Sequence, residues 1–300
     1  MAYEAVASHN LLKTYGGSVE ALRGVAISIQ QGELFTLLGP NGAGKTTYLR
    51  IIATQLLPTK GDAEVLGYDV VEEAKQVRQH IAVVPQDAAA YGNYTPWDYA
   101  YYFAKLRGMP SADAKQAAKK ALEDVELFGL RNRVCASLSG GEKKRAIIAS
   151  ALASKAEVLM LDEPTSGLDA VARRGVWSAL RDMVREGKTI LLTTHIMEEA
   201  EMVSDRLAII HNGTVIADGS PDRVKQMAKE KFRVVVRGKI NSLPAAHDVV
   251  KLGDKQIIYV SNEDEALELV RKVLKKGLNA EAAPITLEDV FVKLVGGWNS

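Results

Sequence analysis

The sequence has 300 residues, of which 47% are hydrophobic and 25% charged, and its formal net charge is +1. This composition is ordinary for a globular protein, and the length allows two domains. A nearly neutral chain lacks the basic surplus of nucleic-acid-binding proteins, so nucleic acid is not expected as a partner. No uncharged apolar run approaches the roughly 20 residues that a membrane-spanning helix needs.

The N-terminal segment and the single cysteine both favour a reducing compartment. The first ten residues, MAYEAVASHN, contain neither a basic cluster nor a long apolar stretch, so no signal peptide is expected. Cys135 is the only cysteine, which excludes an internal disulfide and suits the cytosol. We interpret it as a small buried hydrophobic residue, with a reactive thiol as the alternative.

Apolar runs typical of strands alternate with helical patterns up to about residue 218, which predicts a parallel sheet covered by helices and hence an α/β fold. The runs are LFTLLG (34–39), IAVVPQ (81–86), VLMLDEP (158–164), TILLTTH (189–195) and RLAIIHNG (206–213). The last run leads through Asn212-Gly213 into TVIADG, and this pair predicts a β-hairpin.

The segment GPNGAGKTT follows the first of these strands and precedes the helical pattern TTYLRIIA. It matches the P-loop, whose backbone N–H groups and helix N-terminus surround phosphate oxygens. We expect Lys45 to reach the β- and γ-phosphates and Thr46 to ligate Mg²⁺, and the alternative is a glycine-rich turn without a ligand. The predicted nucleotide-binding residues of the segment are Gly39, Pro40, Asn41, Gly42, Ala43, Gly44, Lys45, Thr46 and Thr47.

The strand signal disappears in the middle of the chain. TPWDYAYYFAKLRG and SADAKQAAKKALEDVELF indicate two or more helices, which predicts an inserted helical subdomain at about residues 95–137. The segment LSGGEKKR follows, and its Ser139, Gly140 and Gly141 expose backbone at what we expect to be a helix start. This turn therefore resembles a second anion-binding site.

The strand VLMLDE ends in two carboxylates. Its four apolar residues predict a buried strand whose carboxyl end presents Asp162 and Glu163 beside the P-loop. We expect Asp162 to hold Mg²⁺ through water and Glu163 to orient and deprotonate the attacking water. Charged residues without a role at an exposed strand end are the alternative.

The character of the chain changes again after Ser220-Pro221. FRVVVRG and KQIIYVS predict strands, EDEALELVRKVLKKG predicts a helix that ends at Gly277, and TLEDVFVKLVGG predicts a final helix. We therefore expect a first domain at residues 1–229 and a small α+β domain at residues 230–300.

The P-loop, LSGGE and LMLDEPTSGLD occur in this order, and together they resemble the ABC-type ATPases over about residues 5–225. The resemblance implies a P-loop NTPase core with an antiparallel β edge and an inserted helical subdomain. It also implies that ATP and Mg²⁺ are bound and that ATP is hydrolysed.

The same resemblance assigns roles to isolated residues. Tyr15 matches an aromatic that stacks on adenine, although a lone tyrosine is more often part of a core. Gln86 matches the glutamine that senses Mg²⁺ and the attacking water and hinges the helical subdomain. SGLD, which ends at Asp169, matches a loop that crosses to the partner subunit. His195 matches a histidine that contacts the γ-phosphate, with a structural histidine as the alternative.

In this family the LSGGE-type signature completes the site of a second copy. Ser139, Gly140 and Gly141 are then implied to cap the γ-phosphate of a partner's ATP, so a head-to-tail dimer of ATPase subunits is implied. The chain carries Glu142 where the commonest signature, LSGGQ, has glutamine. A carboxylate is not attracted to a phosphate, so we expect the Glu142 side chain to contact backbone or ribose hydroxyls.

The resemblance leaves several biological roles open. We favour the motor subunit of a transporter, bound to the cytoplasmic face of the membrane through a separately encoded permease. A soluble ABC-type ATPase of DNA or ribosomes is less favoured, because the insertion lacks heptads and the chain has one ATPase unit. PITLEDVFVKLVGG (284–297) resembles the closing helix of drug and sodium exporters, whereas an importer subunit is the alternative. A set of aromatics is expected either in the subdomain core or in a groove for a permease helix: Trp97, Tyr99, Tyr101, Tyr102 and Phe103.

Overall fold

The computed structural model describes residues 3–238 and 248–295. The chain divides into two compact units between Asp218 and Gly219. Helix α8 (Pro221–Lys225) packs with α10 (Leu287–Leu294), so it belongs to the second unit, whereas the boundary expected at residue 230 assigns it to the first. In the described residues no helix is long and apolar enough to cross a membrane.

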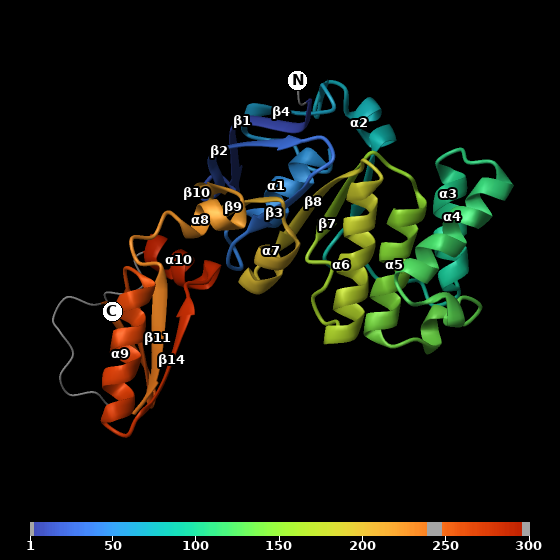
Figure 1. Ribbon diagram of the computed structural model, residues 1–300. Helices are drawn as coiled ribbons and strands as arrows, with labels where there is room; N and C mark the ends of the chain where they lie inside the picture. Colours follow the sequence, from blue (N-terminus) through green and yellow to red (C-terminus); the bar gives the residue numbers. More distant parts are fainter. Residues whose placement is uncertain (1–2, 239–247, 296–300) are drawn as a thin grey trace. The chain divides into compact units, whose positions relative to one another are not determined.

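The first unit is built on a six-stranded sheet (Figure 1). Its strands lie in the order β10 (Thr214–Gly219), β9 (Arg206–His211), β3 (Leu34–Leu38), β8 (Thr189–Thr194), β7 (Val158–Asp162) and β6 (Ile81–Val84). From β9 to β6 neighbouring strands run parallel. Strands β3, β7 and β8 are buried at every residue, as their continuous apolar runs predict. The predicted α/β fold is confirmed.

The alternation of side chains along these strands creates two hydrophobic cores. Phe35 and Leu37 point to one side of the sheet, where they join the core that contains α1 (Lys45–Ile52). Leu34 joins the core on the other side, which contains α5 (Gly140–Ala153) and α6 (Ala170–Arg185). Because both faces are covered, the ends of the strands are the places where polar chemistry can gather.

The antiparallel β edge that the family resemblance implies forms a sheet of its own. The strands are β2 (Val19–Gln30), β1 (Glu4–Tyr15), β4 (Lys60–Val65) and β5 (Tyr68–Asp69), in this order. Every neighbouring pair is antiparallel, and Val6, Leu22 and Val65 join the core of α1. Helix α2 (Ala74–His80) follows this sheet and leads into β6.

The predicted helical insertion consists of helices and contains no strand at residues 95–137, all of which are described. Helix α3 (Pro96–Leu106) begins with a capping box in which Thr95 and Asp98 bond each other's backbone N–H groups. Helix α4 (Ser111–Asp124) and 3₁₀ turns at Phe128–Leu130 and Cys135–Ser137 complete it. Cys135 is fully buried, as expected, and burial raises the pKa of its thiol.

The predicted hairpin between β9 and β10 is confirmed. Asn212 and Gly213 have φ values of 48° and 78°, the left-handed conformations that a two-residue turn of this kind requires. Before it, helix α7 (Met197–Val203) connects β8 to β9.

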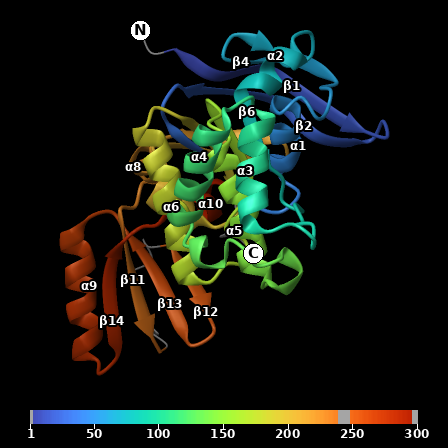
Figure 2. The ribbon, with the colours of Figure 1, turned by 90° about the vertical axis from the view of Figure 1, so that its right-hand side faces the viewer.

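The second unit is an α+β fold whose four-stranded sheet is antiparallel throughout (Figure 2). The order is β12 (Val249–Leu252), β13 (Lys255–Val260), β11 (Phe232–Arg237) and β14 (Asn279–Pro284). Helix α9 (Glu263–Lys275) packs on one face through Ala266, Leu269 and Val273. The predictions of β11, β13, α9 and α10 are confirmed, whereas the sequence analysis missed β12 and β14. The expected helical residues 296 and 297 lie outside the described residues.

Candidate functional site

The P-loop connects β3 to α1, and its shape requires glycine at two positions. A Cβ at Gly44, where φ is 110°, would lie 2.5 Å from the carbonyl oxygen of Ala21. A Cβ at Gly39 would lie 2.3 Å from the carbonyl oxygen of Ile210. These approaches are shorter than any real side chain tolerates, so the path of the loop depends on glycine.

Lys45 is the first residue of α1 and is 5% exposed. Its Nζ donates to the carbonyl oxygens of Gly39 at 2.8 Å and Pro40 at 3.1 Å. Burial lowers the pKa of Lys45, while the nearby Glu163 carboxylate acts to raise it. The ammonium is therefore held against the P-loop by short bonds to its backbone.

Glu163 follows β7 and is 6% exposed. One carboxylate oxygen, Oε1, lies 3.5 Å from Lys45 Nζ and 3.1 Å from His195 Nδ1. The other, Oε2, accepts a hydrogen bond of 3.3 Å from Gln86 Nε2. The structure thus gathers three sequence-predicted site residues around the buried carboxylate of a fourth, Glu163.

Asp162 is the last residue of β7, and its Oδ1 accepts a hydrogen bond from Thr193 Oγ1. Asp162, Thr46 and Gln86 are the three metal ligands that the sequence analysis predicts. Hydroxyl, amide and carboxylate oxygens are the ligands that Mg²⁺ takes in proteins. Among the described residues no group of three or more His, Cys, Asp or Glu side chains could enclose a metal. The donor set fits Mg²⁺ that shares its ligands with nucleotide phosphates.

Thr193 and Glu199 support the site, and the sequence analysis missed both. Glu199 is 1% exposed and accepts hydrogen bonds from Thr165 Oγ1 at 2.8 Å and Thr194 Oγ1 at 2.9 Å. Its carboxylate therefore joins the turn that follows Glu163 to the strand end that carries His195. Arg173 Nε lies 3.4 Å from Glu199, which compensates the buried charge.

Tyr15 ends β1 and is 39% exposed, so it is not a core residue. Its hydroxyl lies 3.4 Å from Thr47 Oγ1 of the P-loop, and Lys13 Nζ lies 5.3 Å from the centre of its ring. An accessible aromatic ring is thereby placed beside the P-loop, which is the arrangement that stacking on a base requires.

The signature turn is organised by its own backbone. Ser139 is the N-cap of α5, and its Oγ accepts from the backbone N–H of Glu142 at 3.3 Å. Glu142 Oε2 in turn accepts from the N–H of Ser139 at 2.7 Å, which completes a capping box. These bonds lower the pKa of Glu142. The expectation that Glu142 contacts backbone is confirmed.

Nothing joins the signature turn to the P-loop by a hydrogen bond or ion pair in the described parts of the chain. A Cβ at Gly140 would meet no atom within 4 Å, so the first residue of α5 faces open space. The Asp169 carboxylate, like that of Glu142, forms its hydrogen bonds with neighbouring backbone. Its Oδ1 accepts from the N–H groups of Ala172 and Val171, both at 2.9 Å. These bonds, led by the one from Ala172, lower the pKa of Asp169.

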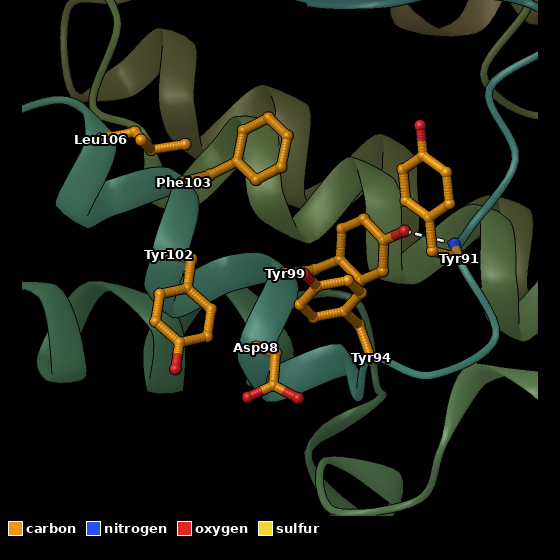
Figure 3. A pocket seen from close by; sticks show the side chains of 7 residues that line it. All are labelled: Tyr91, Tyr94, Asp98, Tyr99, Tyr102, Phe103 and Leu106. Atoms are coloured by element: carbon orange, nitrogen blue, oxygen red, sulfur yellow. Dashed lines mark hydrogen bonds between the residues drawn. The ribbon is translucent and has the colours of Figure 1, made fainter.

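A separate apolar cavity of about 430 Å³ lies in the helical subdomain (Figure 3). It is lined by Tyr91, Tyr94, Asp98, Tyr99, Tyr102, Phe103 and Leu106. The aromatic set of the sequence analysis is thus divided: Tyr99, Tyr102 and Phe103 line this cavity, whereas Trp97 and Tyr101 pack against the core of the unit.

Comparison with known proteins identifies the family. Residues 22–166 match the ABC transporter model. The chain is 35% identical to the daunorubicin resistance ATP-binding protein DrrA3 of Streptomyces coeruleorubidus, in an alignment that covers 99% of this chain and 97% of that protein. The chain is an ATP-binding subunit of the ABC transporter family. The resemblance of its motifs is thereby confirmed.

Two further relatives extend this result. The Nod factor export ATP-binding protein I of Rhizobium etli is 34% identical to the subunit, over 99% of this chain and 95% of that protein. A dimeric ATP-binding cassette in a post-hydrolysis state, bound to ADP and Pi, matches with a TM-score of 0.66 and 27% identity, over 72% of this chain and 98% of that chain. As an ABC ATPase, the subunit hydrolyses ATP.

Proposed function

We propose that the subunit hydrolyses MgATP at composite sites formed by two such chains and thereby drives export through a separately encoded permease. The observation that carries the catalytic part is the convergence of Lys45, Gln86 and His195 on the buried carboxylate of Glu163. A carboxylate at a strand end beside a P-loop is the arrangement in which a base can receive a proton from water.

In this mechanism Glu163 orients the attacking water and accepts its proton. Gln86 and His195 bond the carboxylate from two sides and fix its direction. Lys45 leaves the carbonyl oxygens of the P-loop for the β- and γ-phosphates, whose charge it balances. Phosphoryl transfer depends on positioning and electrostatic stabilisation, and these side chains supply both.

The nucleotide is held by the P-loop backbone and by Tyr15, whose exposed ring stacks on adenine. Thr46, Gln86 and Asp162 are the residues that would hold Mg²⁺. When bound, this ion neutralises charge on the β- and γ-phosphates. Thr193 holds the Asp162 carboxylate in place through its hydroxyl.

The second half of each site comes from the partner chain. Ser139, Gly140 and Gly141 offer a hydroxyl, two N–H groups and a helix N-terminus to the partner's γ-phosphate. The open space at Gly140 and the absence of any bond from the turn to its own P-loop, within the described residues, support this arrangement. Asp169, at the start of α6, belongs to the loop that crosses to the partner.

The direction of transport is inferred from relatives and from the C-terminal segment. One relative is named for drug resistance and another for Nod factor export. Helix α10 lies within PITLEDVFVKLVGG (284–297), the segment that the sequence analysis compared with the closing helix of exporters. We therefore assign the subunit to an exporter, at the cytoplasmic face of the membrane, with no nucleic acid as partner.

The permease is proposed to insert a short helix into the aromatic cavity of the helical subdomain. Leu106 and Tyr91 are 82% and 74% exposed at its rim, and Phe103 and Tyr102 are also accessible. The loop that follows β6 contains Gln86 and continues to Tyr91, which lines the cavity. We propose that a helix bound in the cavity displaces this loop and with it Gln86, which bonds Glu163.

The transport role predicts that a neighbouring gene encodes a six-helix membrane protein, and the experiment that tests the role is binding of the subunit to that protein after purification. The double variant Phe103→Asp, Leu106→Asp should lose this binding, because two charges enter an apolar contact. Leu57→Asp, at another exposed apolar residue that does not line the cavity, should bind normally. Both variants should keep the melting temperature, as exposed substitutions usually do. Binding to ribosomes or DNA instead of the permease would overturn the proposal.

A further inference from the structure

Lys144 lies one turn into α5, two residues after Glu142, which ends the capping box of the signature turn. Its Nζ does not point to solvent, because it donates to the carbonyl oxygen of Glu163 at 2.7 Å and to that of Ser166 at 3.1 Å. The side chain therefore connects the helix that carries the signature to the backbone of the catalytic glutamate.

The backbone of Glu163 needs such support. Its φ is 48°, in the left-handed region that non-glycine residues rarely adopt. Its N–H lies 3.1 Å from both the carbonyl oxygen and the Oγ1 of Thr193. On the other side, its carbonyl accepts from Lys144 and, at 3.3 Å, from the N–H of Ser166. Strained backbone at a functional residue persists only where neighbouring groups hold it in place. Among the groups that bond the Glu163 backbone, the Lys144 ammonium carries a full charge, which makes its hydrogen bond stronger than a neutral one.

The surroundings of Lys144 are acidic. Burial lowers its pKa, while Glu163, Asp162, Glu199 and Asp87 act in the opposite direction. The ammonium is thus the cation that faces the carboxylates from the side of α5, as Lys45 does from the P-loop. Hydrogen bonds from a charged donor to a buried carbonyl are stronger and more directional than neutral ones.

The fold of α5 does not depend on this lysine. The helix is anchored by a continuous buried stretch from Ala146 to Ala153, and its start is fixed by the capping box. Arg145 holds the neighbouring turn through the carbonyl oxygen of Val125 at 3.1 Å. Loss of the Lys144 ammonium therefore leaves the helix packed and removes only the link to Glu163 and Ser166.

We propose that Lys144 is a positioning residue that holds the Glu163 of its own chain in the orientation needed for hydrolysis. The start of α5 then contributes to two ATP sites. The signature turn contacts the ATP of the partner, and Lys144 positions the Glu163 that acts on the ATP of its own chain. This inference rests on the proposed role of Glu163 as general base.

The first test compares Lys144→Met, which keeps the length of the side chain and removes its charge, with Lys115→Met, an exposed lysine of α4. Lys144→Met should lower kcat about tenfold to a hundredfold and change KM for ATP less than about threefold, because a displaced base affects the chemical step and not nucleotide binding. Lys115→Met should match the wild type. Normal kcat in Lys144→Met would overturn the inference, and so would a rise in KM that accounts for the whole loss.

The failure of the proposed function is recognised separately. If Glu163→Gln hydrolyses ATP at a normal rate, Glu163 is not the base and the mechanism fails. If Glu163→Gln is inactive and Lys144→Met is fully active, the mechanism stands and only the role of Lys144 is wrong.

A second test uses dimers of two differently tagged chains and asks which site Lys144 serves. When Ser139→Arg and Lys144→Met are on the same chain and the other chain is wild type, the working site uses the Glu163 that lacks its lysine, so activity should fall. When the two changes are on different chains, the working site keeps its own Lys144, and activity should equal that of the Ser139→Arg and wild-type dimer. The reverse pattern would show that Lys144 acts through the signature turn and would overturn the inference.

Discussion

The two glycine-rich turns of this subunit are held in opposite ways. At the P-loop, Lys45 and Glu163 are nearly buried, and their polar atoms are bonded to residues from distant parts of the chain. At the signature turn, the side chains of Ser139 and Glu142 accept hydrogen bonds from each other's backbone N–H groups, and Gly140 faces open space. One half-site is assembled by the fold of a single chain, whereas the other is a local structure presented to a second molecule.

This difference separates the ATP that a chain binds from the ATP that its partner binds. Changes on the P-loop side should alter binding or hydrolysis of the chain's own ATP, whereas changes at the signature should alter hydrolysis of the partner's ATP and leave ATP binding by the isolated chain intact. The following predictions test this separation, from the largest expected effect to the smallest.

The largest effect is expected for Glu163→Gln. The glutamine amide has the shape of the carboxylate and still forms hydrogen bonds, but it cannot accept a proton from water. Hydrolysis should therefore fall at least about a hundredfold while ATP still binds. The ATP-bound dimer should then accumulate, which light scattering with ATP would detect. Near-normal phosphate release would remove Glu163 from the role of base.

Ser139→Arg should abolish hydrolysis in a different way. A large cation at the start of α5 obstructs the contact with the partner's nucleotide, so turnover should fall at least about a hundredfold. The affinity of the isolated chain for ATP, measured with a fluorescent analogue, should change less than about twofold. Loss of ATP binding by the monomer would place the signature in the site of its own chain and break the comparison.

Tyr15→Ala should weaken nucleotide binding moderately. Stacking of a base on an aromatic ring contributes on the order of 1 kcal/mol, so the Kd for ATP should rise roughly fivefold. Tyr15→Phe keeps the ring and loses only the contact with Thr47, so it is the matched control. Equal affinities in all three proteins would show that the ring does not touch adenine.

The smallest effect is expected at Glu142. Glu142→Gln keeps an acceptor for the N–H of Ser139 and should melt within about 2 °C of the wild type, whereas Glu142→Ala loses the capping box and should melt at a lower temperature. Since the pKa of Glu142 is lowered in the folded state, its stabilisation is present above the ordinary carboxyl pKa and is lost as pH falls through the lowered value. The wild type and Glu142→Gln should therefore differ least in acid. A large drop for Glu142→Gln at neutral pH would mean that the charge, and not the hydrogen bond, organises the turn.

Much of the first unit could be predicted from the sequence because its signals are local. The continuous apolar runs of β3, β7 and β8 and the turn at Asn212-Gly213 identify the parallel sheet and its hairpin. The strands β1 and β2 carry no such run, and the antiparallel sheet was expected only from the family resemblance. The weakly apolar strand β14, NAEAAP, is stabilised by pairing with β11 rather than by its own composition, so the sequence analysis missed it.

The candidate site shows the same division. The sequence analysis proposed Lys45, Gln86, Glu163 and His195 from their motifs. In the structure a nitrogen atom of each of the other three lies within 3.5 Å of a carboxylate oxygen of Glu163. The sequence analysis missed Lys144, Thr193 and Glu199, which support the site through bonds to backbone and to other side chains. Their residue types are common and their spacing from the motifs carries no signal.

The sequence by itself determined the family, the position of both glycine-rich turns and the order of the elements, because motifs and apolar periodicity depend on near neighbours along the chain. Only the tertiary structure decided which atoms meet at Glu163 and that Lys144 turns back to its carbonyl. These contacts depend on backbone angles and helix directions that packing sets. One of these backbone angles is the left-handed φ of Glu163, which the residue type at that position does not predict.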